Sequence, residues 1–404
     1  MNRVLLVSRE ALAFLELERK FQAPPAAWEL LLATTGPKAL DLLAREPIDV
    51  LVCDVLTPGL DGAQLLTEVM RRHPQVVRIV LSGQSDREAQ LRLLGPAHQY
   101  LSKPCDPHQL REVVERAVAL RSMLADEQLK QLISRLHSLP CLPSRYVQLL
   151  HELRSEDPSL DKVGEIISRD MGLSAKILQL VNSAFFGLAQ PVADPLEAAA
   201  YLGIETVKAL VLSIQVFCLF QRATIKEFSF ENLWNHCWVT GVLAKRIAVA
   251  ENLDAKTADQ CFVAGLLHDA GKLVIAYGLP DQFRASLTMA RQKKIPLWQA
   301  ERETLGSTHA EIGAYLLALW GLPNSVVEPV ALHHRPAFCR HEQLSPALAV
   351  HVANSLDHDR YAGDAQHSSS HLDHDLLASL NLTDRLTAWR RCGDNNEVRD
   401  AVSR

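Results

Sequence analysis

The segment VLVCD at residues 50–54 decides the fold of the N-terminal part of the chain, together with VLTPGLDG at residues 55–62. Four apolar residues in a row predict a strand that is buried on both faces of a sheet. Pro58 and Gly59 predict a turn soon after this strand. The turn would expose the carboxylate of Asp54 at the carboxyl end of the strand.

Four other short apolar or β-branched runs occur in the first 120 residues, separated by amphipathic segments; they are residues 4–7, 30–34, 76–81 and 99–101. Strands that alternate with helices predict a doubly wound α/β domain, with a five-stranded parallel sheet and helices on both faces, as in flavodoxin-like folds. The functional site of such a sheet lies beyond the carboxyl ends of its strands. Polar residues follow four of the strands there: Ser8, Asp54, Ser82 and Lys103.

This combination resembles the receiver domain of two-component response regulators, over residues 1–120. The resemblance implies that Asp54 accepts a phosphoryl group, and that Ser82 and Lys103 contact the phosphoryl oxygens. It implies as partner a sensor histidine kinase or another phosphodonor. A change at Asp54 would then alter how the face that bears Tyr100 meets the helix that follows.

The residues after the first strand depart from the receiver pattern. The family binds Mg²⁺ through an acidic pair at this point, where the present chain has Ser8 and Arg9, with only Glu10 acidic. Mg²⁺ prefers oxygen ligands that carry carboxylate charge, so we expect its binding here to be weakened. Arg9 could itself pair with Asp54. Two hypotheses stay open: phosphorylation at Asp54, and phosphate-independent docking of a partner.

Apolar residues recur at helical spacing from residue 106 to residue 136, and the segment LPCLP at residues 139–143 follows. The spacing predicts one continuous helix that connects two domains. The helix should end before residues 139–143, because paired prolines stop helix propagation. Its apolar stripe could pair with a second copy of the chain in a homodimer. Alternatively, the stripe packs on the chain's own domains.

Beyond Pro143 the periodicity is helical to about residue 391, without a convincing strand, which predicts an all-α region. The segment resembles the HDOD family of signalling output domains, and we place the domain at residues 137–338. A C-terminal helical extension, residues 339–404, would include a polar loop at 357–375. The matching positions are Leu139, Pro140, Leu142, Pro143, Asp170, Lys176, Asn182, Ser183, Gly187, Leu202 and Gly203.

HDOD domains are related to HD-type metal phosphohydrolases, but the HDOD domains have generally lost catalysis. The resemblance implies that a divalent metal, if one binds, is held by His236, His268, Asp269, His309, His333 and His334. Asn354 occupies the place of the aspartate that closes the family's site. Asp357, three residues further on and on nearly the same helix face, could substitute for it, although the spacing differs from the family's pattern. Because an amide is a weaker ligand than a carboxylate, we expect weaker metal affinity.

The residues therefore favour a hydrogen-bonded polar network in a non-catalytic scaffold that acts through contacts with a downstream protein. A metal-dependent phosphohydrolase or phosphodiesterase is one alternative, and a sensor of a nucleotide second messenger is another. The Gly-Tyr-Pro signature of the HD-GYP subgroup is absent after His334, where the chain reads RPAFCRH. Hydrolysis of a cyclic dinucleotide is therefore not expected.

Charge and hydropathy exclude other classes of partner. The 404 residues include 42 Lys and Arg against 47 Asp and Glu, so there is no overall positive field for nucleic acid. The longest near-apolar run, residues 209–220, is shorter than the roughly 20 residues that span a bilayer. The N-terminus lacks a cleavage site for a signal peptide. We predict a cytoplasmic two-component-type signalling protein that contacts neither membrane nor nucleic acid.

Overall fold

The computed structural model describes the chain in segments: residues 2–8, 28–55, 57–82, 96–103, 107–121, 124, 126–134, 136, 140–141, 143–153, 155, 157–182, 192–204, 207, 218–219, 228–338, 344–360 and 372–393. The chain forms two compact units, one made mainly of residues 1–137 and the other mainly of residues 138–404. The first unit contains the sheet, and the second contains the longer helical region.

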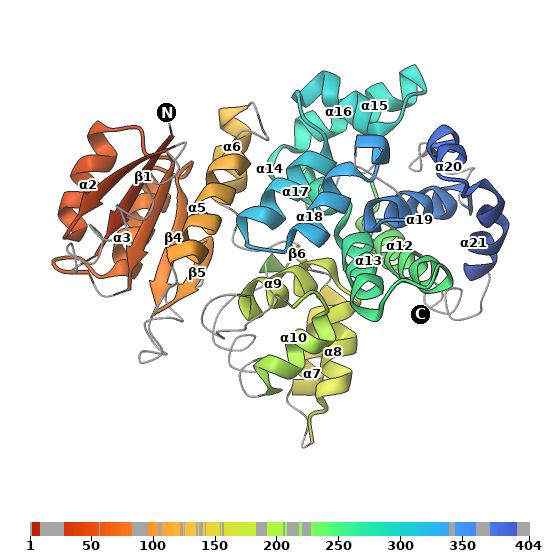
Figure 1. Ribbon diagram of the computed structural model, residues 1–404, viewed down its shortest axis with the longest axis horizontal. Helices are drawn as coiled ribbons and strands as arrows, with labels where there is room; N and C mark the ends of the chain where they lie inside the picture. Colours follow the sequence, from red (N-terminus) through yellow and green to blue (C-terminus); the bar gives the residue numbers. More distant parts are fainter. Residues whose placement is uncertain are drawn as a thin grey trace. The chain divides into compact units, whose positions relative to one another are not determined.

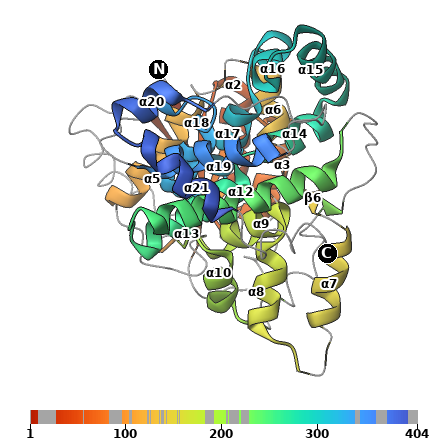
Figure 2. The same ribbon diagram turned by 90° about the vertical axis from the view of Figure 1, so that its right-hand side faces the viewer.

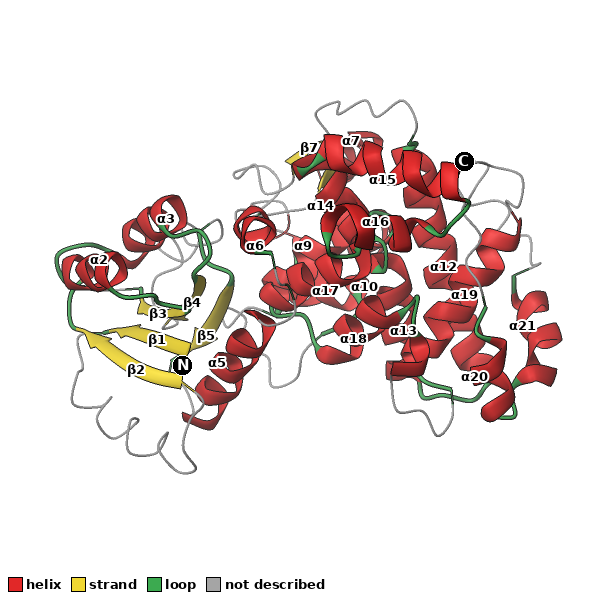
Figure 3. Ribbon diagram, turned by 90° about the horizontal axis from the view of Figure 1, so that it is seen from above, coloured by secondary structure: helices red, strands yellow, loops and turns green. Residues whose placement is uncertain are grey.

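The first unit contains a five-stranded parallel sheet, as the alternation of runs predicted. Its strands are β1 (Asn2–Val7), β2 (Trp28–Ala33), β3 (Val50–Asp54), β4 (Val77–Ser82) and β5 (Gln99–Ser102), in the spatial order β2-β1-β3-β4-β5. Helices α2 (Gly36–Arg45) and α3 (Gly62–Arg72) cover one face, and α5 (Pro107–Arg121) covers the other (Figures 1 and 3). The prediction of a doubly wound α/β domain is confirmed.

The packing at the start of α3 holds the end of β3 in place. Asp61 caps α3, because its side chain accepts a hydrogen bond from the N–H of Gln64. A Cβ atom at residue 62 would lie 2.5 Å from the carbonyl oxygen of Asp54. Only glycine therefore allows the helix to begin this close to the backbone of Asp54.

The prediction of one continuous helix over residues 106–136 is wrong. Helix α5 ends at Arg121, Leu124 and Asp126 are not helical, and α6 spans Glu127–Ser134. The carboxylate of Asp126 accepts hydrogen bonds from the N–H groups of Gln128 and Leu129. This capping starts a new helix, whereas apolar spacing alone does not reveal where one helix stops and the next begins.

The second unit is helical, apart from strands β6 (Pro140–Cys141) and β7 (Cys218–Leu219), which pair in parallel. This short pair is a departure from the expected absence of strands. The helices are α7 (Pro143–Leu153), α8 (Leu160–Ser168), α9 (Met171–Val181), α10 (Pro195–Leu202), α12 (Phe230–Ala250), α13 (Ala255–Leu267), α14 (Ala270–Gly278), α15 (Pro280–Lys293), α16 (Leu297–Leu305), α17 (His309–Leu319), α18 (Asn324–Leu332), α19 (Pro346–Arg360), α20 (His374–Ser379) and α21 (Leu386–Cys392). Between α18 and α19 lies the 3₁₀ turn η1 (Pro336–Phe338), and between α20 and α21 lies η2 (Thr383–Arg385).

The prediction of a polar loop at 357–375 is wrong at both ends of this range. Helix α19 continues to Arg360 and α20 begins at His374, so both ends of the predicted loop are helical. Within the described residues, one helical stretch, Ala255–Gly278, is long and apolar enough to cross a membrane. Since 83% of its most apolar window is buried inside the protein, it is a core segment.

Helices α12, α13, α18 and α19 pack against one another and form the core of the second unit. Gly241 of α12 and Gly265 of α13 meet where the two helices are closest: a Cβ atom at residue 265 would lie 2.7 Å from the Cα atom of Gly241. This close approach brings His236, in the second turn of α12, next to His268, which caps the end of α13.

Candidate functional site

Three of the predicted receiver residues meet at the carboxyl ends of the strands. Asp54 ends β3 and is only 6% exposed. The hydroxyl of Ser8, which follows β1, donates a hydrogen bond to Oδ2 of Asp54. The ammonium of Lys103, which follows β5, forms an ion pair with Oδ1 of the same carboxylate. Both oxygens of Asp54 are therefore engaged by neighbouring side chains.

The other predicted receiver residues lie partly or wholly outside the described residues. Arg9 and Glu10 are among those that the structure does not describe, so the suggested pairing of Arg9 with Asp54 stays a prediction. Ser82 ends β4 and Tyr100 lies in β5, but their side chains are not described. At the place of the family's acidic ligands, Ser8 presents a hydroxyl that donates to Asp54 rather than a carboxylate that would bind Mg²⁺.

The predicted histidines of the helical unit surround one carboxylate, that of Asp269. His236 comes from α12, His268 and Asp269 from the junction of α13 and α14, His309 from the start of α17, and His333 and His334 from the end of α18. Asp269 is fully buried. The fold thus gathers residues that are nearly 100 positions apart in the sequence.

One side of the cluster faces Oδ2 of Asp269. The Nε2 atoms of His236 and His268 lie 3.2 Å apart. They lie 3.8 Å and 3.4 Å, respectively, from Oδ2 of Asp269. The ammonium of Lys272, one turn along α14, also donates to this oxygen at 2.5 Å.

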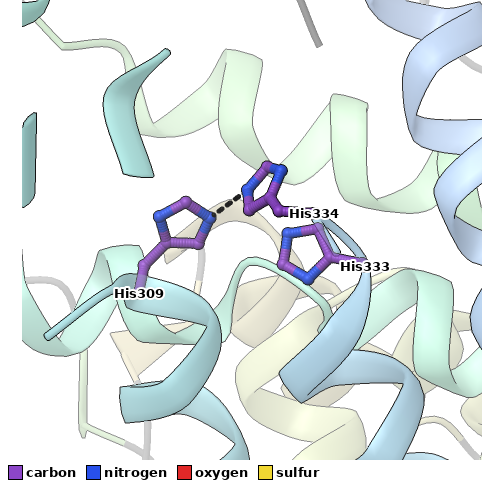
Figure 4. A group of neighbouring side chains, drawn as sticks. All are labelled: His309, His333 and His334. Carbon is purple, nitrogen blue, oxygen red and sulfur yellow. Dashed lines mark hydrogen bonds between the residues drawn. The ribbon is translucent and has the colours of Figure 1, made fainter. Parts of the chain in front are cut away.

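The other side faces Oδ1 of Asp269 and contains His309, His333 and His334. Figure 4 shows these three histidines. Nε2 of His309 lies 3.1 Å from this oxygen, and Nε2 of His333 lies 3.9 Å from it. Nε2 of His334 lies 2.9 Å from Nε2 of His309. The carboxylate of Asp269 thus lies between two groups of imidazole nitrogens, each facing a different oxygen.

In four of these histidines the other ring nitrogen, Nδ1, forms a hydrogen bond. Nδ1 of His268 donates to the carbonyl of Gly265 at 2.7 Å, and Nδ1 of His333 donates to that of Val330 at 2.8 Å. The acceptors for Nδ1 of His309 and His236 are carboxylates, those of Glu301 at 2.6 Å and Asp357 at 2.7 Å. Since a neutral imidazole has one N–H, each neutral ring of this set turns the lone pair of Nε2 toward Asp269.

Burial keeps most of these rings neutral. It lowers the pKa of His268 to about 3 and holds the pKa values of His333 and His334 well below the ordinary value. His309 behaves differently: burial alone would lower its pKa, but the carboxylate of Glu301 raises it. For Asp269, burial would raise the pKa, but His268, Lys272 and His309 hold it well below the ordinary range.

The geometry fits a divalent metal. Ligand atoms of a tetrahedral zinc site with bonds of about 2.1 Å lie about 3.4 Å apart. The three distances among His236, His268 and Asp269 are 3.2, 3.4 and 3.8 Å. His309, His333 and His334 form a second group whose ligand atoms lie within 4.8 Å of one another. A carboxylate or carbonyl lies behind the rings of His236, His268, His309 and His333, which is the support that metal-bound histidines have in other proteins.

The sequence did not predict two outer residues of the cluster, Glu301 and Lys272. Asp357 also lies in a different place from the one expected. Glu301, on α16, and Lys272, on α14, contact the cluster, but no spacing rule links Glu301 to His309. Asn354 is buried, and its amide has no hydrogen-bond partner within the described residues. One turn further along α19, Asp357 contacts the outer nitrogen of His236 and not the side of the cluster that faces Asp269.

Comparisons with known proteins identify both units. The response regulator receiver domain matches residues 4–115, and the HDOD domain matches residues 139–336. The chain therefore belongs to the response regulators, with a receiver domain followed by an HDOD output domain. Both resemblances seen in the sequence are confirmed, and with them the general role in two-component-type signalling.

Each of the following similar proteins matches only part of this chain. An uncharacterized protein of Treponema pallidum is 28% identical over 243 residues, 60% of this chain and 45% of the relative. The response regulator protein PilR of Pseudomonas aeruginosa is 39% identical over 92 residues, 22% of this chain and 20% of PilR. The chain thus spans less than half the length of either relative. The crystal structure of a virulence factor from Campylobacter jejuni is similar in fold, with a TM-score of 0.51 and 19% sequence identity. The similarity covers 69% of this chain and 98% of the chain of the virulence factor.

Proposed function

We propose that this response regulator passes a signal from Asp54 to an HDOD domain that holds divalent metal. One observation carries the metal assignment: the imidazoles of His236, His268, His309 and His333 have their Nδ1 atoms committed outward and their Nε2 atoms turned toward Asp269. Lone pairs that face one another at close range in a buried site repel unless a cation or a proton lies between them. This favours a metal centre over the non-catalytic polar network that the sequence favoured.

A proton can take the place of a metal at only part of the cluster. His309 has a raised pKa, so a proton on its Nε2 atom would link it to Oδ1 of Asp269. His268 has a strongly lowered pKa, which opposes a proton between it and His236. His236, His268 and Asp269 would hold a divalent metal here, which would supply the positive charge that their facing lone pairs need. The low pKa of Asp269 also supports metal binding, because the ligand must be ionised.

Phosphoester hydrolysis is a second candidate function, favoured by Lys272. Its ammonium contacts Asp269, and its side chain is 11% exposed, whereas the carboxylate is fully enclosed. Lys272 is therefore a positively charged group of the cluster, and a phosphate group could approach it from solvent. A bound divalent metal would activate a water molecule and polarise the phosphoryl oxygen. Asp269 would orient Lys272, and Asp357 would keep His236 in the tautomer whose Nε2 atom carries no proton.

The receiver would act as the switch. A phosphoryl group on Asp54 would replace the contacts that Oδ1 makes with Lys103 and Oδ2 makes with Ser8. Alternatively, a docking partner would change the same contacts without phosphate. Shifting a two-state equilibrium by about 1–3 kcal/mol is enough to alter output. The phosphodonor would be a sensor histidine kinase or a small acyl phosphate, and a downstream protein would receive the signal.

The test of the metal centre uses the full chain, purified without a histidine tag. Elemental analysis should find Zn, Mn or Fe bound to the wild type, and His268→Ala should lose at least half of it. His374→Ala, an exposed histidine on α20, is the matched control and should keep it. A wild type without metal after incubation with Zn²⁺ and Mn²⁺ contradicts the proposal. Manganese-dependent cleavage of bis-p-nitrophenyl phosphate, lost in His268→Ala, would add the hydrolytic function.

The test of the switch compares the wild type with Asp54→Asn. Incubation with acetyl phosphate and Mg²⁺ should give a hydroxylamine-labile adduct at Asp54 if the phosphorylation route operates. The output of the HDOD domain would then be measured by comparing the proteins that co-purify with the wild type and with Asp54→Asn. Identical capture by both chains, with and without phosphodonor, contradicts control by the receiver.

A further inference from the structure

The C-terminal segment 372–393 is joined to the histidine cluster through His351. This residue lies on α19 and is buried. Its Nδ1 atom donates a hydrogen bond of 2.7 Å to the carbonyl of His333, and its Nε2 atom accepts one of 3.0 Å from the N–H of Asp373. A carbonyl only accepts and an amide N–H only donates. The two bonds together therefore fix a neutral ring with its proton on Nδ1.

The carbonyl that His351 holds belongs to the peptide group between His333 and His334. The orientation of this peptide sets the directions in which both imidazoles leave the backbone. Nε2 of His333 lies 3.9 Å from Oδ1 of Asp269, and Nε2 of His334 lies 2.9 Å from Nε2 of His309. One hydrogen bond from His351 therefore steadies the two neighbouring side chains that face the second side of the cluster.

The segment that His351 reaches is itself fixed to α12, the helix that carries His236 (Figure 2). Trp389 of α21 is buried, and its Nε1 atom donates to the carboxylate of Glu251 at 2.8 Å. Arg385 donates to the same oxygen, also at 2.8 Å. The segment is thus tied to the helix of one metal-facing histidine and, through His351, to the backbone of two others.

We infer that His351 is a positioning residue through which segment 372–393 sets the metal affinity of His309, His333 and His334. This inference rests on the proposed metal centre. His351 and Asp373 both lie beyond residue 336, where the HDOD match ends. Displacing the segment would release the His333 peptide and loosen one metal site while leaving His236 and His268 in place.

The test replaces His351 so that each of its two bonds is removed separately. In His351→Asn the side-chain amide lies near the former Nδ1 position and can still donate to His333. In His351→Gln the longer side chain reaches toward Asp373 and loses the bond to His333. His351→Leu loses both bonds and keeps much of the volume. His374→Gln, on the exposed side of α20, is the matched control.

Titration of the full-length, metal-free variants with Mn²⁺ measures affinity by calorimetry. We expect the weaker of two binding constants to fall about tenfold in His351→Gln and His351→Leu, the lower end of the range for residues behind metal ligands. His351→Asn and His374→Gln should match the wild type. Hydrogen exchange should rise at residues 330–336 in His351→Gln and His351→Leu, a readout independent of turnover.

Two results would overturn the inference. Wild-type Mn²⁺ affinity in a folded His351→Leu chain, with unchanged exchange at residues 330–336, would refute the positioning role and leave the metal centre intact. Absence of Mn²⁺ binding in the wild type would refute the metal centre and the inference with it. Circular dichroism of each variant identifies those that fail to fold, and His351→Gln then serves in place of His351→Leu.

Discussion

Nδ1 of His236 lies 2.7 Å from Oδ2 of Asp357, so a carboxylate stands behind a ring whose other nitrogen faces Asp269. The two residues are 121 positions apart, and both are buried. The carboxylate fixes the proton of the ring on Nδ1 and strengthens Nε2 as a ligand. In the proposed metal centre, Asp357 would therefore act from behind the ring of His236 and would not itself contact the metal.

Replacing Asp357 by asparagine should weaken metal binding while the fold persists. Asp357→Asn keeps the size of the side chain but removes the charged acceptor, and we expect a 10- to 100-fold loss of affinity, as for other residues behind metal ligands. Competition with a chromophoric zinc chelator measures the change. Asp359→Asn, at an exposed position of the same helix, is the control. Equal affinities of the two variants would argue against a role for the carboxylate.

The position of Asp357 marks the limit of what the sequence reveals. Helical spacing places Asn354 and Asp357 on one face of α19, so either could have been the closing residue. The choice depends on how α19 crosses α12, which no local pattern encodes. Glu301 was missed for the same reason, because it belongs to a different helix from His309 and meets it only through packing.

The receiver was easier to predict. Buried parallel strands appear as apolar runs, and their carboxyl ends must meet at one edge, so Asp54, Ser8 and Lys103 could be placed together from the sequence. The break between α5 and α6 was missed because Asp126 acts through a cap, while the apolar spacing continues across it. Periodicity reports which face is buried and says little about where a helix stops.

Adding one methyl group at Gly271 should disturb the second side of the cluster. A Cβ atom there would lie 1.9 Å from the carbonyl oxygen of His309, so Gly271→Ala must push α17 away from α14. We expect a loss of about 1–3 kcal/mol in the free energy of unfolding and weaker binding of one metal ion. Urea unfolding and Mn²⁺ titration measure the two effects.

Gly306→Ala is the control for Gly271→Ala. No atom lies within 4 Å of a Cβ at residue 306, but the backbone there has φ of +70°, which strains any other residue. It should therefore lose stability and keep metal binding. If Gly271→Ala also kept wild-type metal binding, the contact between α14 and α17 would not position His309.

The metal-free protein should lose stability in acid. His268 stays neutral in the folded state because burial lowers its pKa to about 3, whereas an unfolded histidine titrates near 6.5. Between these values the unfolded chain binds more protons, so the free energy of unfolding falls as the pH falls. Each such histidine contributes about 1.4 kcal/mol per pH unit. His333 and His334 act in the same direction, and His309, whose pKa is raised, acts in the opposite one.

Urea unfolding in EDTA between pH 7.5 and 4.5 measures this slope. His268→Gln removes one of the buried rings, so its slope should be shallower than that of the wild type by about 1.4 kcal/mol per pH unit. Superimposable slopes for the two chains would mean that His268 is protonated in the folded state, contrary to its enclosed position.

The buried guanidinium of Arg78 should be essential to the receiver unit. Arg78 is fully buried, and it donates to the carbonyls of Pro96 at 2.6 Å, Val76 at 3.1 Å and Ser134 at 2.8 Å. The last contact fixes the end of α6 to β4. Arg78→Met leaves the carbonyls of Pro96 and Val76 without this donor, and leaves the carbonyl of Ser134 with Nε2 of His98. Each buried carbonyl that loses its partner should cost about 1–3 kcal/mol. Hydrogen exchange in α6 should rise.

Two comparisons make the Arg78 prediction specific. Arg78→Lys should not rescue the receiver, because one ammonium cannot replace a planar group with several donors. Arg71→Met, at an exposed position of α3, should have little effect. Unaltered exchange at Glu127–Ser134 in Arg78→Met would show that the contact with Arg78 does not hold α6 in place.

Ser8 should control whether the receiver binds Mg²⁺. Its hydroxyl donates to Asp54 where the family has an acidic residue, and Ser8→Asp would turn this neighbour into a second carboxylate. Two carboxylates repel unless a cation lies between them, so Mg²⁺ affinity should rise at least tenfold, or about 1.4 kcal/mol. Ser8→Asn has the same size without the charge and should bind no better than the wild type. Calorimetry that gave Ser8→Asp the affinity of Ser8→Asn would mean that the missing charge at residue 8 does not limit Mg²⁺ binding.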